Sequence, residues 1–514
     1  MKAKGKNPAK EHYQKLRILP WQQLWEHEVP LFDKADATQR MKDVALVRAV
    51  GVVFSESGTP ELKEDVAKWL SGLLSDPQEK IRRYAMAALP KIGMGAESEG
   101  DLLELLKKTP LDREKKFLGR TLGKIGGEAT LEVIDALPEQ AVQKVKANVA
   151  RGLAPGSIRL AATLHDWRDV GIHLRGRRGL EGFVKEEVET SPEARRKFRV
   201  TSVAPGLVVL AAKAPFSLAD LCTMRCFGTL GLVLGTISRA GDATYVDELA
   251  QVIASPLSQH ILRTLTDGTV RYRLDFISKG HQRHAVQEVA AEAFKLCPAV
   301  INDARNATWA VDIHPTGRGV SVELRPRFSP DPRFSYRRQD VPAASHPPLA
   351  ACMARMAGNS GSDVVWDPFC GSGLELIERV RLGGVTRVFG TDLSSEAIGI
   401  AKANLAEAKL DVSSKFVCCD FRDLAIREGL QPGSITQIIT NPPLGRRVPI
   451  HDLNGLIDDL FTTAALMLRP GGRLVLANPL PIKKQIKSGL HLDSSQVVDF
   501  GGFDCRVESY TKRG

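Results

Sequence analysis

The sequence predicts three structurally different parts: an all-helical N-terminal region, a central α+β region and a C-terminal α/β domain. Apolar residues at helical spacing run from about residue 40 to 155. Alternating apolar runs separated by turns follow, and the last part holds three short apolar runs that each end in polar or glycine residues. A chain of 514 residues is too long for one core, and the usual domain size favours about three domains.

The composition is that of a soluble globular protein, with 43% hydrophobic and 25% charged residues. The net charge of +11 makes an anionic partner plausible, although a basic protein without such a partner is also compatible with it. The apolar stretch at 207–237 is interrupted by charges, so we expect no transmembrane helix and no membrane partner. The basic N-terminus has no apolar stretch behind it and does not resemble a secretory signal.

The 8 cysteines are scattered, and the adjacent pair at 418 and 419 suits a reducing compartment. Cys222 and Cys226 have no second Cys or His pair at zinc spacing, so we expect no metal site. A cytoplasmic enzyme or binding protein is the class that remains.

Residues 1–38 are rich in lysine, and we expect a basic, flexible arm there. Helical periodicity over 39–155 contains one repeated motif: Leu89-Pro-Lys-Ile-Gly93 recurs as Leu122-Gly-Lys-Ile-Gly126, 33 residues later. This region resembles HEAT-type helical repeats, with a spacing shorter than is usual for that class. Such stacks present a broad surface, so it is either a docking platform for RNA or a protein partner, or a stabilising cap on the rest of the chain.

Residues 156–335 predict a mixed α+β region. Within it, a strand, a basic loop, a helix and two more strands follow in order over about 245–327. That order resembles the THUMP domain, a module that binds RNA in RNA-modifying enzymes. The resemblance implies an RNA partner for this protein.

Residues 336–514 predict an open α/β sheet whose strand ends form a ligand crevice. Asp367-Pro-Phe-Cys-Gly-Ser-Gly373 follows the first strand, and Gly371 and Gly373 allow the backbone to approach a ligand closely. Asp392 ends the next strand, where such a sheet places a carboxylate that binds ribose hydroxyls. Asp420 ends a third strand and suits an exocyclic adenine amine. These strand ends indicate an adenosine-containing cofactor, which by spacing alone includes a dinucleotide.

Asn441-Pro-Pro-Leu444 follows a later strand and favours a methyl donor over a dinucleotide as the cofactor. The Asn side-chain oxygen and the next backbone carbonyl form two acceptors, which Pro442 and Pro443 hold rigid. Such a pair binds an exocyclic amine of a planar substrate and aligns its lone pair with a methyl donor.

Together these motifs resemble the S-adenosylmethionine-dependent methyltransferases that act on amino nitrogens. They are most similar to the THUMP-containing RNA guanine-N2 methyltransferases, whose tRNA enzymes are the nearest comparison. The resemblance implies a Rossmann-like class I methyltransferase that methylates N2 of a guanosine, in tRNA. It implies that Asp367, Gly371 and Gly373 hold the methionine end, Asp392 the ribose, and Asp420 with Phe421 the adenine. Phe369, Cys370 and Leu393 complete the expected cofactor site, and Asn441, Pro442, Pro443 and Leu444 the catalytic one.

Two residues depart from the family pattern. Leu374 replaces a common Thr, and Leu444 stands where many members carry an aromatic ring that stacks on the target base. Loss of that ring costs on the order of 1 to 3 kcal/mol of base binding. Two arginine pairs flank the predicted site and are candidates for contact with RNA phosphates: Arg446 with Arg447, and Arg337 with Arg338.

Two alternatives stay open at the level of sequence. The same acceptor pair suits an amino-methyltransferase that acts on adenine or cytosine of RNA or DNA. A catalytically inactive RNA-binding scaffold is the other alternative, because Leu444 alters the pocket.

Overall fold

The computed structural model describes residues 8–152, 156–238, 245–277, 282–342, 344–444, 450–481 and 489–513. It forms two compact units. The first comprises residues 1–155 and 283–306, and the second comprises residues 156–282 and 307–514. None of the described helices is long and apolar enough to cross a membrane.

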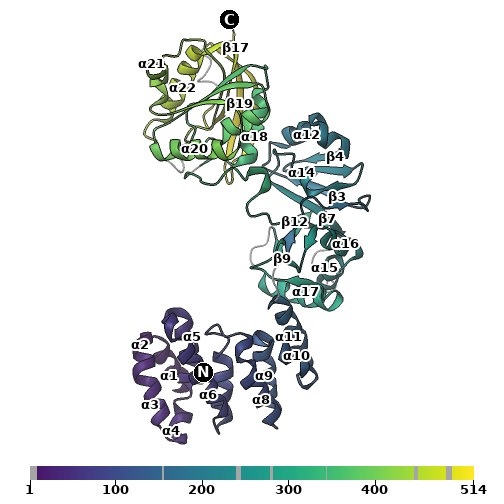
Figure 1. Cartoon of the computed structure of the whole chain (residues 1–514), viewed down its shortest axis with the longest axis vertical. Helices are drawn as coiled ribbons and strands as arrows, with labels where there is room; N and C mark the ends of the chain where they lie inside the picture. The colour runs from purple at the N-terminus through teal and green to yellow at the C-terminus, as the bar shows by residue number, and fades with distance from the viewer. Residues whose placement is uncertain are drawn as a thin grey trace, which may run out of the picture. The chain divides into compact units, whose positions relative to one another are not determined.

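The first unit is a stack of short helices (Figure 1). Helices α1, α5, α7, α9 and α11 form one row, in which each packs on the next, and α8 contacts α10 beside it. The helical elements of the stack are α1 Pro8–Arg17, α2 Trp21–Gln23, η1 Leu24–Glu28, α3 Val29–Lys34, α4 Ala37–Lys42, α5 Ala45–Ser57, η2 Pro60–Leu62, α6 Lys63–Gly72, η3 Leu73–Ser75, α7 Glu79–Ala88, η4 Ala96–Ser98, α8 Glu99–Lys108, α9 Asp112–Ile125, α10 Glu128–Glu132, η5 Ile134–Ala136 and α11 Glu139–Gly152. The unit also includes α17 Arg283–Leu296 and β10 Val300–Asn302.

Over residues 8–38 the structure differs from the flexible arm expected for residues 1–38, whose first seven residues lie outside the described part of the chain. Residues 8–38 form α1, α2, η1, α3 and the start of α4, and their apolar side chains join the core of the stack. Trp21 is buried, stacks on Trp25 at 5.5 Å between ring centroids and meets Phe54 edge-on at 5.0 Å. The lysines of this segment suggested flexibility, but its aromatic side chains bury a large apolar surface, which orders the segment.

The central part of the second unit is built on one sheet. Within this unit its strands run in the order β9-β11-β12-β7-β3-β5-β4, and only β9 and β11 pair in parallel. The sheet therefore merges strands from 156–240 and 270–327 that lie far apart in the sequence. Its elements are β1 Ser157–Ile158, β2 Thr163–Leu164, β3 Gly171–Arg175, α12 Glu181–Thr190, α13 Pro192–Lys197, β4 Phe198–Ala204, β5 Leu207–Ala212, β6 Phe216–Ser217, α14 Leu218–Leu221, β7 Thr229–Ile237, α15 Tyr245–Ile253, α16 Pro256–Leu265, β8 Thr266–Asp267, β9 Val270–Phe276, β11 Trp309–Thr316 and β12 Gly319–Pro326.

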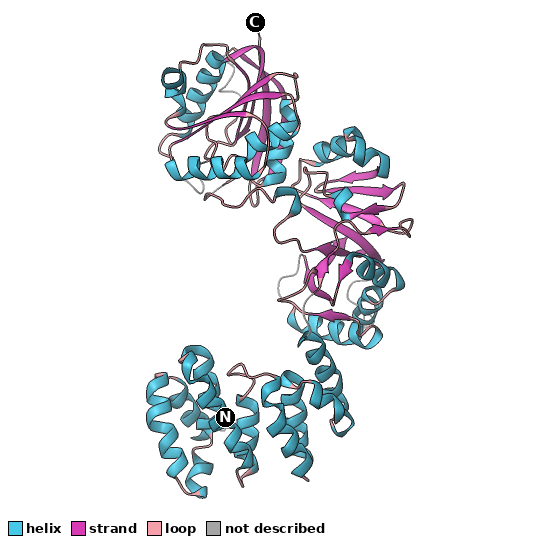
Figure 2. Ribbon diagram, in the orientation of Figure 1, coloured by secondary structure: helices cyan, strands magenta, loops and turns pink. Residues whose placement is uncertain are grey.

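The C-terminal part confirms the predicted α/β domain. A 7-stranded sheet has the order β15-β14-β13-β16-β17-β19-β18, with helices on both faces (Figure 2). The first five strands in that order pair in parallel, and β19 and β18 close the sheet in antiparallel fashion. The elements are η6 Pro332–Phe334, α18 Pro347–Ala357, β13 Asp363–Asp367, α19 Leu374–Arg381, β14 Val385–Asp392, α20 Ser395–Glu407, β15 Ser413–Cys418, η7 Phe421–Asp423, α21 Leu424–Glu428, β16 Ile435–Thr440, α22 Leu453–Met467, β17 Leu468–Asn478, β18 Leu490–Asp499 and β19 Asp504–Lys512.

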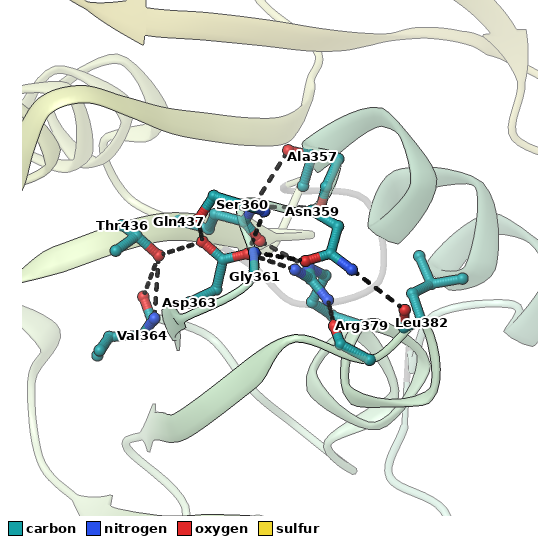
Figure 3. A network of polar contacts seen from close by, with 12 residues as sticks. Ala357, Asn359, Ser360, Gly361, Asp363, Val364, Arg379, Leu382, Thr436 and Gln437 are labelled. Atoms are coloured by element: carbon teal, nitrogen blue, oxygen red, sulfur yellow. Dashed lines mark hydrogen bonds and ion pairs between the residues drawn. The ribbon is translucent and has the colours of Figure 1, made fainter.

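A buried polar network holds the amino ends of these strands together (Figure 3). Arg379 of α19 donates to Asp363 at the start of β13 over 2.6 Å and to Gln437 of β16 over 2.7 Å. Thr436 donates to the other oxygen of Asp363 over 2.8 Å. The buried charges of Arg379 and Asp363 are stable because they are paired, and the pair fixes the amino ends of β13 and β16. The carboxyl ends of the strands, at the opposite edge of the sheet, are not part of this network.

Ion pairs also join the central sheet region to the C-terminal domain within the second unit. Arg225 binds both carboxylate oxygens of Glu378 at 2.6 and 2.7 Å, and the Tyr336 hydroxyl donates to the same carboxylate over 2.6 Å. The Glu378 side chain is buried, so Arg225 and Tyr336 together satisfy a charge that would otherwise be costly.

Candidate functional site

A cavity of about 780 Å³ lies at the carboxyl ends of β13, β14, β15 and β16. The parallel strands bring together motifs that are far apart in the sequence, because their carboxyl ends meet at one edge of the sheet. The predicted site residues that line this cavity are Phe369, Cys370, Gly371, Asp392, Leu393, Asp420, Phe421, Asn441, Pro442, Pro443 and Leu444.

Asp392 is held in place by the glycine-rich turn. One of its carboxylate oxygens accepts from the backbone N–H of Gly371 over 3.0 Å, and the other accepts from that of Ser394 over 2.9 Å. Gly371 and Gly373 have φ of 46° and 82°, a region that favours glycine. The turn thus orients a carboxylate at the cavity wall, where it has further acceptor capacity for hydroxyl groups.

Asp420 and Phe421 form the neighbouring part of the wall. The Asp420 carboxylate accepts from the backbone N–H of Arg422 over 2.9 Å and from its guanidinium over 2.7 Å. The Phe421 ring is buried and packs on the Phe369 ring at 5.0 Å between centroids. The pair of rings gives this wall an apolar surface beside a carboxylate, which suits a purine with an exocyclic amine.

Two predicted cofactor residues do not line the cavity. Asp367 is fully buried; one of its oxygens accepts from the Phe369 N–H over 3.0 Å and from the Thr440 hydroxyl over 2.6 Å. Burial, with the nearby charge of Glu375, raises the pKa of the Asp367 carboxyl well above its usual value. Asp367 therefore braces the wall from behind, and Gly373 starts α19 in the left-handed conformation without reaching the cavity surface.

The Asn441 amide has a defined orientation. Its Nδ2 donates to the Ser345 hydroxyl over 2.8 Å, and Ser345 in turn donates to Glu375. Its Oδ1 is buried and has no hydrogen-bond partner among the described residues. A buried acceptor without a partner is costly, so this oxygen is available to an N–H donor that enters the cavity.

Sequence reasoning missed Ser345 and Glu375. Ser345 precedes α18 and lies 96 residues from Asn441, so no local spacing connects them. Glu375 is buried, and that burial raises the pKa of its carboxyl. The sequence offered one signal for Glu375: it lies between the apolar Leu374 and Leu376 at the start of α19.

The C-terminal hairpin and the central region also contribute to the cavity. Phe500 and Phe503 line it from the β18–β19 turn, and Arg177 lies over the Phe500 ring at 5.3 Å. Arg177 also donates to the backbone carbonyl of Asp499 over 3.1 Å. These residues place a cation and two rings at the cavity, a contribution that the sequence motifs did not indicate.

The four arginines predicted to contact RNA have different outcomes. Arg446 and Arg447 lie outside the described residues. Arg337 pairs with Asp340, and Arg338 pairs with Glu407 over 2.7 Å. Arg338 therefore links the segment before α18 to α20, whereas Arg337 pairs within that segment, and neither arginine lines the cavity.

Known proteins resemble parts of this chain. The family model described as "RMKL-like, methyltransferase domain" matches residues 335–489. A tRNA (guanine(10)-N2)-dimethyltransferase of Methanothermobacter thermautotrophicus is 29% identical over 140 residues, which are 27% of this chain and 39% of that protein. A protein of the same name from Methanocaldococcus jannaschii is 28% identical over 171 residues, which are 32% of this chain and 46% of that protein. The chain thus spans less than half the length of either relative.

One solved structure supports the fold over a longer stretch. TrmN from Thermus thermophilus has a TM-score of 0.51 at 20% sequence identity and covers 67% of this chain and 99% of its own. The RMKL-like family model is one of S-adenosylmethionine-dependent methyltransferases. Residues 335–489 therefore carry a methyltransferase domain of the S-adenosylmethionine-dependent class.

Proposed function

We propose that this chain is an RNA methyltransferase that transfers a methyl group from S-adenosylmethionine to the exocyclic N2 of a guanosine in tRNA. The observation that carries the proposal is the Asn441 amide, whose buried Oδ1 has no partner among the described residues and belongs to a residue that lines the cavity. An acceptor in that position selects a substrate that brings an N–H donor.

The residues of the cavity fit the cofactor. Asp392, oriented by the Gly371 turn, offers acceptors to ribose hydroxyls, and Asp420 with Phe421 offers an acceptor and an apolar surface to adenine. Gly371 lines the cavity, so the backbone there can approach the remaining part of the ligand closely. S-adenosylmethionine supplies an electrophilic methyl group when it is bound.

The chain's own residues then position the nucleophile. Asn441 Oδ1 and the Pro442 carbonyl accept the two N–H groups of the amine, which directs the nitrogen lone pair toward the methyl donor. The same two dipoles stabilise the positive charge that develops on nitrogen during transfer. A strong base is unnecessary before the attack, because the proton leaves the nitrogen after the methyl group has been added.

Guanosine in tRNA is favoured by three observations. The two curated relatives are named for that reaction, and the net charge of +11 suits a polyanionic substrate. The order β9, α17, β11 and β12 supports a THUMP-like RNA-binding domain over about 245–327. Leu444 also lines the cavity, and in this proposal its side chain covers a face of the base without aromatic stacking and without distinguishing guanine from other bases.

For the first unit, we propose that residues 39–155 form HEAT-like helical repeats that serve as a docking surface. The row of α5, α7, α9 and α11 supports it, since each helix packs on its neighbour in the row. Such a stack provides a surface for RNA or for a protein partner.

The test of the proposed function is the Asn441→Ala variant. We expect methyl transfer to tRNA to fall by at least about a hundredfold, because the variant loses one of two acceptors at the amine. The affinity for S-adenosylmethionine, measured by calorimetry, should not change. Asn359→Ala is the matched control: Asn359 belongs to the network at the opposite end of the sheet (Figure 3), so its variant should remain active.

Nucleoside mass spectrometry identifies the substrate. RNA from cells that lack the protein should have lost an N2-methylated guanosine. Loss of a methylated adenosine or cytidine would contradict the guanine assignment, and full activity of Asn441→Ala would contradict the mechanism.

A further inference from the structure

The repeated motif of the first unit places lysines at equivalent positions on one face of the helical row. Lys91 follows α7 and Lys124 belongs to α9, and both side chains are exposed. Arg48 is exposed on the neighbouring helix α5. The pKa of Lys91 is lowered first by partial desolvation of its ammonium group, which is still exposed, and then by the positive charges of Arg48, Lys124 and Arg17, so these cations share one local field.

Helix α9 extends this surface along its length. Beyond the exposed Asp112 at its first residue, the exposed side chains of α9 recur every three or four residues and are basic, whereas Leu118, Leu122 and Ile125 on the other side are buried. We call the combined surface the basic face; it consists of Arg48, Lys91, Arg113, Lys116, Arg120 and Lys124.

The cations of the basic face are not neutralised within the protein. In the part of the chain that the structure describes, none of the six is in an ion pair, although Arg48 and Arg120 lie over aromatic rings at 4.5 and 5.4 Å. Nearby arginines on other faces are paired: Arg82 with Glu114 at 2.6 Å, and Arg40 with Asp76 at 2.8 Å. The basic face thus retains its charge for an external anion.

On the other side of the stack, exposed lysines are mixed with exposed acidic residues. On α6 and α8 the exposed side chains include Glu64, Asp65, Asp101 and Glu104, and the acidic residues of these helices outnumber the lysines. Adjacent packed helices lie about 8 to 10 Å apart, so cations at equivalent positions form a row with regular spacing. A regular, one-sided row of unpaired cations is complementary to a phosphodiester backbone, which carries a charge at every nucleotide.

We propose that the basic face binds the phosphate backbone of RNA. Lysine and arginine side chains would contact phosphate oxygens without reading bases, so the face adds affinity and orientation while leaving the choice of nucleotide to the cavity. The inference extends the proposed function by naming the partner of the helical unit. It does not depend on methyl transfer.

The test measures binding of a fluorescent tRNA transcript to the full chain by anisotropy over a range of KCl concentrations. The variant carries Lys91→Gln, Arg120→Gln and Lys124→Gln. We expect its Kd to rise by about 10-fold to 100-fold at moderate salt. The slope of log Kd against log salt should fall by about 2 to 3, because each lost phosphate contact removes about 0.7 to 0.9.

A matched control removes the same amount of charge from the other side of the stack, with Lys68→Gln, Lys107→Gln and Lys108→Gln on α6 and α8. These lysines are exposed, so both triple variants should fold, as circular dichroism can verify. The control should bind tRNA with nearly the wild-type slope. Equal losses in both variants would reduce the effect to net charge and overturn the inference.

Wild-type affinity and slope in the first variant would also overturn it. Retained tRNA binding together with lost binding of a polyglutamate peptide would assign the basic face to an acidic protein instead. The binding assay is independent of catalysis: a chain that binds tRNA through this face but transfers no methyl group would contradict only the proposed function.

Discussion

At the scale of single residues, the orientation of one amide decides what the cavity can bind. The Asn441 amide presents Oδ1 to a donor because Ser345 holds Nδ2 at 2.8 Å. If the amide turned over, an NH₂ group would face the substrate amine and repel it. Ser345 is itself fixed by the buried Glu375, so the three residues form one chain of hydrogen bonds.

We predict that Ser345→Ala lowers kcat for tRNA methylation by about 10-fold to 100-fold, because misorientation of a positioning group has costs of that order. The affinity for S-adenosylmethionine should not change. Ser345→Thr, which keeps the hydroxyl, should restore most of the activity. The Asn441→Asp background gives a sharper comparison: both oxygens of a carboxylate accept, so Ser345→Ala should cost less there. Equal costs in the two backgrounds would show that Ser345 does not orient the amide.

At the scale of elements, the helical row depends on close approach between neighbouring helices. Gly51 of α5 packs against α7, and a Cβ added there would lie 2.7 Å from the Ala88 Cβ and 2.9 Å from its Cα. No such obstacle exists at Gly72 of α6, where nothing lies within 4 Å of an added Cβ. Alanine substitutions at the two glycines therefore distinguish the effect of packing on stability from the effect of helix propensity.

We predict that Gly51→Ala destabilises the first unit by about 1 to 3 kcal/mol, because overpacking forces α5 and α7 apart. Gly72→Ala should be stabilising by up to about 1 kcal/mol, because alanine favours the helix more than glycine does. Urea unfolding of the full chain, followed by circular dichroism, measures both. A Gly51→Ala protein as stable as wild type would contradict the packing of these helices.

At the scale of the whole molecule, the fold determines which of the 8 cysteines can react. Cys418 is exposed, whereas the others are buried or half-buried. Burial raises the pKa of Cys222 to about 11 and that of Cys505 to about 12, so their thiols stay protonated near neutral pH.

We predict that a thiol reagent such as DTNB modifies Cys418 in a fast phase at neutral pH, and the remaining thiols only slowly. All 8 cysteines should react in denaturant. Cys418→Ser should abolish the fast phase. A fast phase that survives this substitution would mean that another thiol is exposed and that the described fold is wrong near it.

Much of the C-terminal domain could be predicted from the sequence. The motifs around Asp392, Asp420 and Asn441 occur at the ends of apolar runs, and the chemistry of each depends on residues next to it in the chain. Their meeting at one cavity follows from a general rule of parallel sheets, which needs no knowledge of distant contacts. The repeat at 89–93 and 122–126 could also be recognised from the sequence, because each copy is a short contiguous motif.

The remaining features depended on contacts between distant segments. The burial of Trp21 in the helical stack was invisible because its partner Phe54 lies beyond the segment that the sequence presented as a lysine-rich arm. The place of Asp367 behind the cavity wall is set by Thr440, 73 residues away. Local periodicity determined the elements and the cofactor motifs of this protein. Only the tertiary structure decided that Ser345 orients Asn441 and that Lys91 and Lys124 share one face, because long-range packing brings these side chains together.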